Sequence, residues 1–163
     1  MKLKRDFTIG MTLLLLIVVI PFLGFQLNKA PKAKPENAPL SEFSAARAMK
    51  HLEKIAAEPH PIGSVAHTRV RDYIIEELKK MGVEPEIQTA EVFYPGSLSG
   101  AGTWLAATVR NIIVKLPGKE SGKSVLVVGH YDSVPDSYGA TDDGSAVVSM
   151  LETIRILLLK KPL

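Results

Sequence analysis

The chain has 163 residues, of which 46% are apolar and 23% charged, and it contains no cysteine. This composition excludes a wholly disordered chain, a disulfide scaffold and any site built on thiolates. The first 40 residues carry a net charge of +4 and the rest is close to neutral, so the basic excess of the chain flanks an apolar run. We therefore expect a membrane surface as a partner and no nucleic acid.

An apolar segment at the amino end predicts a membrane anchor. Residues 7–27 contain no charged side chain, and 21 residues of helix span about 31 Å, close to the hydrocarbon thickness of a bilayer. A cleavable signal peptide is the main alternative, but it would have a shorter apolar region and small residues at a cleavage site. A buried core helix is disfavoured because the segment has no amphipathic stripe. We predict a tail over 1–6, a transmembrane helix over 7–27 and an extended Pro/Lys stalk over 28–40.

The orientation of this anchor depends on the charges at its two ends. Three basic residues lie on each side of the segment. The rule that the more basic flank lies in the cytoplasm therefore barely distinguishes the two orientations. The short amino-terminal tail favours a single-pass membrane protein with its domain on the extracytoplasmic side.

Residues 41–163 alternate between helical and strand patterns. Ser44 is an N-cap candidate for a helix to about residue 57, and a second helix is predicted over about 67–81 with Gly82 after its end. Strands are predicted over 83–93 and 108–116, separated by a loop of small residues over 94–102.

The last part of the chain completes the predicted fold. The apolar run SVLVVG at 124–129 is typical of a central strand that is covered on both faces, and an apolar helix follows over about 144–160. This order predicts an α/β three-layer sandwich with a mostly parallel, mixed central sheet. The final helix should lead into a further parallel strand, so we expect 41–163 to be the front portion of a larger domain.

The stretch VVGHYDSVPDSYGATDDGSA at 127–146 carries the candidate chemistry. His130 and Asp132 follow the predicted buried strand, at the sheet edge where ligands bind in open α/β folds. The imidazole is a common transition-metal ligand, and Asp132 is placed to accept a hydrogen bond from its other ring nitrogen. Asp142 and Asp143 stand at the start of the last helix, where a carboxylate can reach back to the strand end and bridge two cations.

A plainer interpretation stays open on these residues alone. In it, His130 is a strand-end histidine without a ligand, Asp132 forms a turn, and Asp142 and Asp143 cap a helix. For His60, between two prolines, a place near a substrate pocket is the alternative to the solvated position that we expect, and His67 is expected at a helix surface.

The motifs GHYDS and GATDDGSA resemble those of the di-zinc aminopeptidases of metallopeptidase clan MH, most of all the membrane-bound branch with the endoplasmic reticulum metallopeptidases. The segment FSAARAMKHLEKIAAEPHPIGS resembles the entry segment of that branch, so the similarity spans about residues 43–161. The resemblance implies that His130 and the bridging Asp142 are zinc ligands, that Asp132 orients His130, and that Asp143 supports Asp142 across an often cis peptide bond.

The resemblance also implies a substrate and a reaction. A complete relative would use two zinc ions and a general-base Glu to hydrolyse peptide bonds near a free amino terminus. That Glu and the remaining ligands are expected beyond residue 163, so this chain is expected to be inactive alone. Two other functions stay open: a non-catalytic binding or scaffold module on the same fold, and a zinc acyltransferase such as a glutaminyl cyclase.

Overall fold

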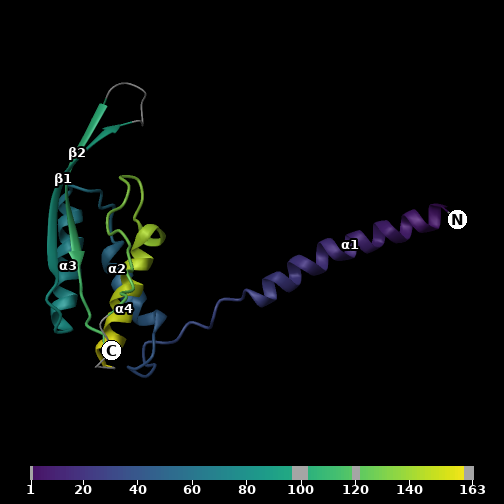
Figure 1. Ribbon diagram of the computed structural model, residues 1–163, viewed down its shortest axis with the longest axis horizontal. Coiled ribbons are helices and arrows are strands. Elements are labelled where there is room, and N and C mark those ends of the chain that lie inside the picture. Colours follow the sequence, from purple (N-terminus) through teal and green to yellow (C-terminus); the bar gives the residue numbers. More distant parts are fainter. Residues whose placement is uncertain (1, 97–102, 119–121, 160–163) are drawn as a thin grey trace. The chain divides into compact units, whose positions relative to one another are not determined.

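The structure of the chain is a computed structural model that describes residues 2–96, 103–118 and 122–159. It divides into two compact units, residues 1–32 and residues 33–163 (Figure 1).

The first unit is the single helix α1, Lys2–Leu27. Residues 7–27 have a mean hydropathy of 2.5, and none of the most apolar part is buried against the rest of the protein. By length and composition α1 is long and apolar enough to cross a membrane. The helix begins five residues before the predicted anchor, so the charged tail is helical as well.

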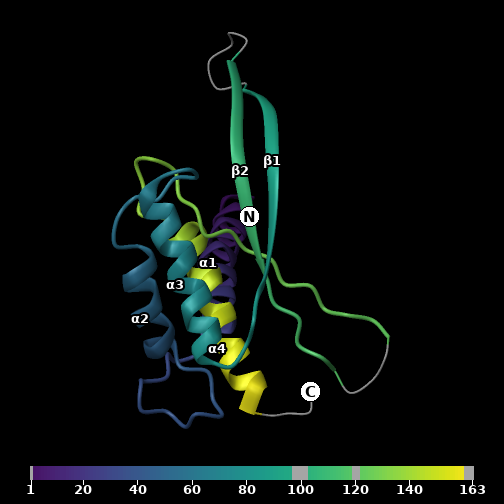
Figure 2. The ribbon, with the colours of Figure 1, turned by 90° about the vertical axis from the view of Figure 1, so that its left-hand side faces the viewer.

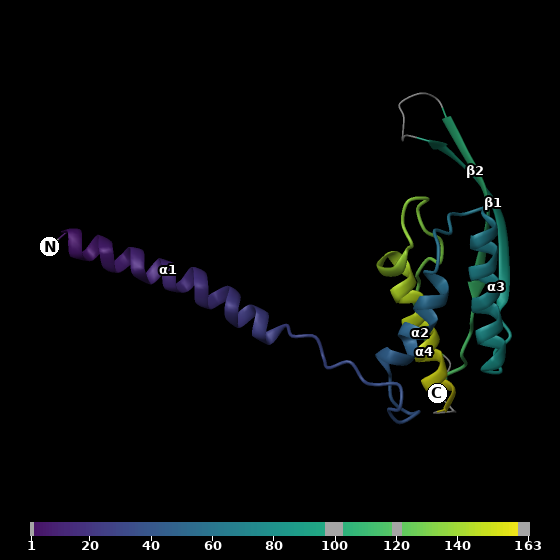
Figure 3. The ribbon, with the colours of Figure 1, turned by 180° about the vertical axis from the view of Figure 1, so that it is seen from behind.

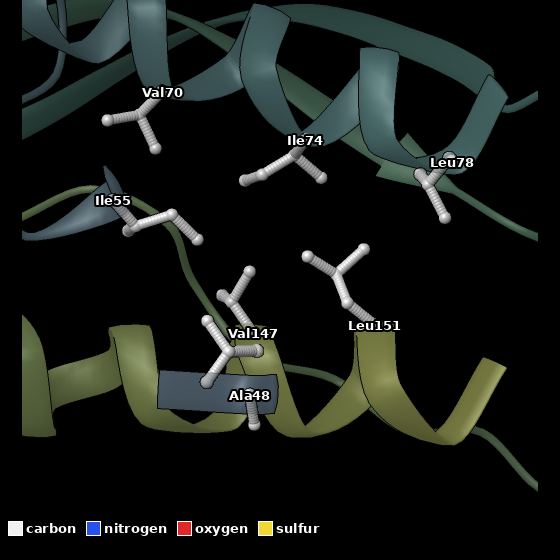
Figure 4. Packing of buried hydrophobic residues seen from close by; sticks show 8 residues of the cluster. Ala48, Ile55, Val70, Ile74, Leu78, Val147 and Leu151 are labelled. Carbon is white, nitrogen blue, oxygen red and sulfur yellow. The ribbon is translucent and has the colours of Figure 1, made fainter. Parts of the chain in front are cut away.

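The second unit combines helices with one β-hairpin, visible from two sides in Figures 1 and 3. Its elements are α2 (Ala45–Ile55), α3 (Val65–Lys80), β1 (Glu86–Gly96), β2 (Thr103–Ile113), the single turn η1 (Ala140–Gly144) and α4 (Ser145–Leu159). The core lies between α2, α3 and α4, where apolar side chains of the three helices point toward one another (Figure 4). Its buried members are Ala48, Ile55, Val70, Ile74, Leu78, Val147, Val148 and Leu151.

Side-chain caps set the starts of two helices. The Ser44 hydroxyl accepts a hydrogen bond from the backbone N–H of Arg47 at 3.2 Å, as predicted. Ser64 does the same for His67 at 3.0 Å, so α3 begins two residues earlier than its apolar pattern predicted. At the other end of α3, Gly82 has φ +77°, a conformation that glycine adopts without steric cost.

Strands β1 and β2 form an antiparallel hairpin. Their register runs from Glu86 opposite Ile113 to Gly96 opposite Thr103. Strand β1 therefore extends three residues into the predicted 94–102 loop, and β2 begins five residues before the predicted strand at 108. Residues 97–102 of that loop lie outside the described residues.

The predicted central strand at 124–129 is absent from the structure. These residues have no regular secondary structure, and the side chains from Val125 to Val128 are 66–91% exposed. A strand requires a neighbour that pairs with its backbone N–H and C=O groups, and the described part of the chain contains only the β1–β2 hairpin. The α/β class is thus confirmed, whereas the sheet of the described residues is a two-stranded antiparallel one and not the predicted three-layer sandwich with a mostly parallel, mixed sheet.

A buried carboxylate joins α4 to the start of α2. Glu152 on α4 is 1% exposed, and its Oε1 accepts hydrogen bonds from the backbone N–H of Ser44 at 2.9 Å and from Arg47 Nε at 3.0 Å. Arg155 donates to the same carboxylate from Nε at 2.7 Å and from Nη2 at 2.8 Å. Two guanidinium groups thus neutralise one buried acid, the arrangement in which burial of a charge is tolerated.

The same two arginines hold the segment 34–42, which we call the strap. The Arg47 guanidinium donates to the backbone oxygens of Glu36, Ala38, Pro39 and Glu42 at 2.6, 2.9, 3.4 and 2.7 Å. Arg155 donates to those of Leu40 at 2.6 Å and Glu42 at 3.1 Å. The predicted 28–40 stalk therefore has two parts, because its second half is bonded to the helical unit.

The charge of Glu152 gives the unit an expected pH dependence. Burial alone would raise the pKa of Glu152, but its bonds to Arg155, Ser44 and Arg47 together hold that pKa below the ordinary value of 4.5. Since the folded pKa is the lower one, this stabilisation is complete above about pH 4.5 and is lost as the pH falls toward the lowered pKa. We expect the melting temperature to fall in that range, and to fall less in Glu152→Gln. Parallel pH profiles of the two proteins would contradict this.

Candidate metal centre

His130 lies between two carboxylates, although twelve residues separate it from one of them. Its Nε2 is 3.0 Å from Asp142 Oδ1. On the other side of the ring, Nδ1 is 3.1 Å from the backbone oxygen of Asp132 and 3.3 Å from its Oδ1. The predicted cluster of His130, Asp132 and Asp142 is therefore brought together at one place.

The carboxylate of Asp142 is presented by the turn η1, directly before α4. Residues 140–144 form a wide turn in which the Gly144 N–H donates to the backbone oxygen of Gly139 at 2.9 Å. The peptide bond between Asp142 and Asp143 is cis.

The neighbouring carboxylate of Asp143 turns toward the backbone of His130. Its Oδ2 accepts a hydrogen bond from the backbone N–H of His130 at 3.4 Å. The same oxygen would lie 2.9 Å from a Cβ at Gly129, so a side chain at position 129 would displace the Asp143 carboxylate. The Asp143 side chain thus ties the segment that carries His130 to the turn that carries Asp142.

The charges around His130 favour a cation at this place. Burial alone would lower the pKa of His130, but the hydrogen bond to Asp142, the bond to the backbone of Asp132 and both carboxylate charges together raise it above 6.5. With Nδ1–H donating to Asp132, the lone pair of Nε2 faces Asp142. A proton or a metal ion between Nε2 and that carboxylate removes the repulsion.

The donor atoms present fit part of a zinc site. Ligand atoms 2.0–2.1 Å from a tetrahedral zinc ion are about 3.3 Å from each other, close to the 3.0 Å between His130 Nε2 and Asp142 Oδ1. The side chains of His130 and Asp142 are 50% and 90% exposed and thus accessible to an ion. Within the described ranges no group of three or more His, Cys, Asp or Glu side chains is arranged to hold a metal.

Two histidines that the sequence interpretation placed in solvent are buried beneath the site. His60 is 1% exposed and His67 is 7% exposed, so both expectations are wrong. Burial lowers the pKa of His67, an effect that the charge of Asp132 partly opposes. Local sequence could not reveal this burial, because it involves residues far along the chain: Tyr131 stacks on the His67 ring, and Ser133 bonds to the backbone of His60.

The chain is similar in sequence to known proteases. Residues 111–162 match the sequence model of peptidase family M28. A vacuolar membrane protease of Kluyveromyces lactis is 29% identical over 97% of this chain and 19% of its own length. Proteins of the same name from Coprinopsis cinerea and Schizosaccharomyces japonicus are 31% and 30% identical over 88% and 97% of the chain. The chain spans a fifth or less of the length of these relatives.

A solved structure shares the fold. The crystal structure of Macrostomum lignano glutaminyl cyclase matches 80% of this chain and 40% of its own, with a TM-score of 0.55 and 23% sequence identity. At that identity the similarity concerns the fold alone.

Proposed function

The chain belongs to peptidase family M28, and on that premise we propose that it forms the first part of the catalytic domain of a membrane-anchored, zinc-dependent aminopeptidase. The observation that carries the proposal is the 3.0 Å contact between His130 Nε2 and Asp142 Oδ1 across twelve residues. The two side chains are as far apart as two ligands of one zinc ion. A role of Asp142 as a helix cap and of His130 as a strand-end residue would not require this contact.

Each polar side chain of the cluster has a proposed task. His130 and Asp142 would hold zinc, with Asp142 as the ligand that the two ions have in common. Asp132 fixes the ring of His130 through Nδ1, and Asp143 fixes its backbone N–H. When bound, zinc supplies Lewis-acid polarisation of the scissile carbonyl of a peptide substrate. The general-base Glu and the remaining ligands are proposed to come from sequence beyond residue 163.

The exposed apolar run supports a larger sheet in the intact protein. By intact protein we mean the complete product of the gene that encodes the chain. The apolar side chains from Val125 to Val128 are exposed to water, which is unfavourable in free energy. The relatives are at least five times longer than the part matched here, so they contain further sequence that could pair with this run. The proposal is that 124–129 becomes a central strand when strands from the remaining sequence pair with it, which completes the three-layer sandwich.

Membrane attachment through α1 is part of the proposal. The relatives are named as membrane proteases, and residues 7–27 have the length and hydropathy of a span. We propose an extracytoplasmic domain, with lipid contacts confined to residues 7–27.

A glutaminyl-cyclase-like acyltransferase is the second candidate, and the fold similarity to such an enzyme favours it. Substrate tests separate the two candidates. A peptidase releases the first residue of a peptide with a free amino terminus, whereas a cyclase acts on amino-terminal glutamine without cleaving the chain.

The metal assignment is tested by zinc analysis of the intact protein and its His130→Ala variant. We expect the variant to lose at least one zinc per chain, because the imidazole is a direct ligand. His51→Ala is the matched control: its ring, on α2, bonds to Tyr73 at 2.7 Å and should leave zinc content unchanged. Equal zinc content in the parent and in His130→Ala would remove the proposal.

A further inference from the structure

The segment that carries His130 has two faces with different partners. His130 and Asp132 point into the candidate metal centre and are about half exposed. Tyr131 and Ser133, which alternate with them, lie against the helical unit, where Tyr131 packs on the core and Ser133 is 6% exposed. Alternation of this kind is that of an extended chain, so whatever grips residues 131 and 133 also fixes the direction of residues 130 and 132.

Tyr131 packs against His67, in the first turn of α3. The two rings are stacked, with centroids 4.7 Å apart and planes inclined by 7°. The Tyr131 hydroxyl donates to the backbone oxygen of Arg110 at 2.6 Å. One side of the tyrosine is thus set by α3 and its far end by the hairpin.

Ser133 is hydrogen-bonded to His60. The backbone N–H of His60 donates to Ser133 Oγ at 2.8 Å, and the backbone N–H of Ser133 donates to the carbonyl oxygen of His60 at 3.3 Å. The His60 ring is held in turn by its Nδ1, 2.8 Å from the backbone oxygen of Glu58. Both bonds to Ser133 use the backbone of His60, so the His60 ring acts on Ser133 by fixing that backbone through Glu58.

The same two residues also touch the loop that leads to Asp142. A Cβ at Gly139 would lie 2.8 Å from Ser133 Cβ and 3.4 Å from His60 Cε1. Gly139 accepts the hydrogen bond from Gly144 that closes the turn carrying Asp142. His60 and Ser133 are therefore in contact with both of the segments that supply the candidate ligands.

We propose that His60, through Ser133, and His67, through Tyr131, are positioning residues that set the distance between His130 and Asp142. The inference rests on the proposed function, and it goes beyond it in assigning this task to two buried histidines that neither contact the candidate ligands nor bind metal. Removal of a ring that supports metal ligands indirectly typically lowers metal affinity 10–100-fold.

The test uses the intact protein and compares His67 with His51. Both histidines contact a tyrosine ring: His67 stacks on Tyr131, and His51 lies 6.0 Å from Tyr73 at a 52° inclination, away from the candidate metal centre. We expect His67→Ala and His60→Ala to lower zinc affinity, measured by competition with a chromophoric chelator, about tenfold or more. His67→Phe, which keeps the stacked ring, should recover most of that loss, and His51→Ala should show none.

Amide hydrogen exchange of the metal-free proteins is the second measurement. We expect faster exchange at the N–H groups of Ser133 and Gly144 in His67→Ala and His60→Ala, and parental rates in His67→Phe and His51→Ala. Parental zinc affinity and exchange in both histidine-to-alanine variants would overturn the inference. So would an equal loss of affinity in His51→Ala, because the effect would then follow general stability.

The two proposals fail in different ways. If His130→Ala leaves zinc affinity unchanged, the metal centre itself is refuted, and the exchange rates alone decide whether the two histidines fix the loop. If His130→Ala loses zinc while His60→Ala and His67→Ala retain it, the metal centre stands and the positioning role is refuted.

Discussion

Replacement of Asp142 with asparagine is expected to lower peptide hydrolysis by the intact protein by more than about 100-fold, beyond what loss of an indirect ligand contact costs. The amide is neutral and offers one acceptor oxygen in place of two, so it cannot share a charge between two ions. It also places no negative charge 3.0 Å from His130 Nε2. The measurement is the initial rate of release of an amino-terminal residue, together with the zinc content.

The matched control is Asp136→Asn, which neutralises an exposed acid between His130 and the turn η1. It changes the net charge by the same amount without touching the cluster, and we expect the parental rate and zinc content. If Asp142→Asn retained more than about a tenth of the parental rate, Asp142 would not be a metal ligand, since indirect contacts alone account for losses of 10–100-fold.

Replacement of Glu152 with alanine is expected to lower the free energy of unfolding by about 3–5 kcal/mol, the usual cost of removing one partner from a buried ion cluster. The variant leaves two guanidinium groups beside a cavity and removes the acceptor of the Ser44 N–H. The measurement is urea denaturation, at a pH above 5 where the carboxylate of the parent is charged.

Glu53→Ala is the control for this variant, because Glu53 is an exposed acid on α2. Its effect should stay within about 0.5 kcal/mol. The strap supplies a second readout: in Glu152→Ala the two arginines lose their anchor, and we expect faster proteolytic cleavage between residues 34 and 42. A loss below about 1 kcal/mol with an uncut strap would show that the cluster does not stabilise the unit.

Local sequence signals predicted the parts of the fold that depend on nearby residues. The Ser44 cap, the turn at Gly82 and the apolar faces of α2, α3 and α4 need only neighbours within a few positions. The proximity of His130 and Asp142 was also predicted, because the loop between them is short and rich in small residues.

Features that depend on distant residues were not predictable from one sequence. The apolar pattern at 124–129 specifies a strand only where another strand pairs with it. The burial of His60 depends on Ser133, 73 residues further along. The strap depends on Arg47 and Glu152, which are 105 residues apart, so its prolines and lysines were interpreted as an extended stalk.

The bonded strap shortens the link between anchor and domain. Only residues 28–33 separate the end of α1 from the first backbone oxygen held in the strap, that of Lys34. In Figure 2 the strap, in dark blue, lies at the opposite end of α2 from the segment that carries His130. Six extended residues reach about 20 Å at most, so a short linker joins the proposed catalytic domain to its proposed anchor. A linker of this length would raise the effective concentration of the proposed active site toward peptides adsorbed at the same membrane. It would not change its concentration toward peptides free in solution.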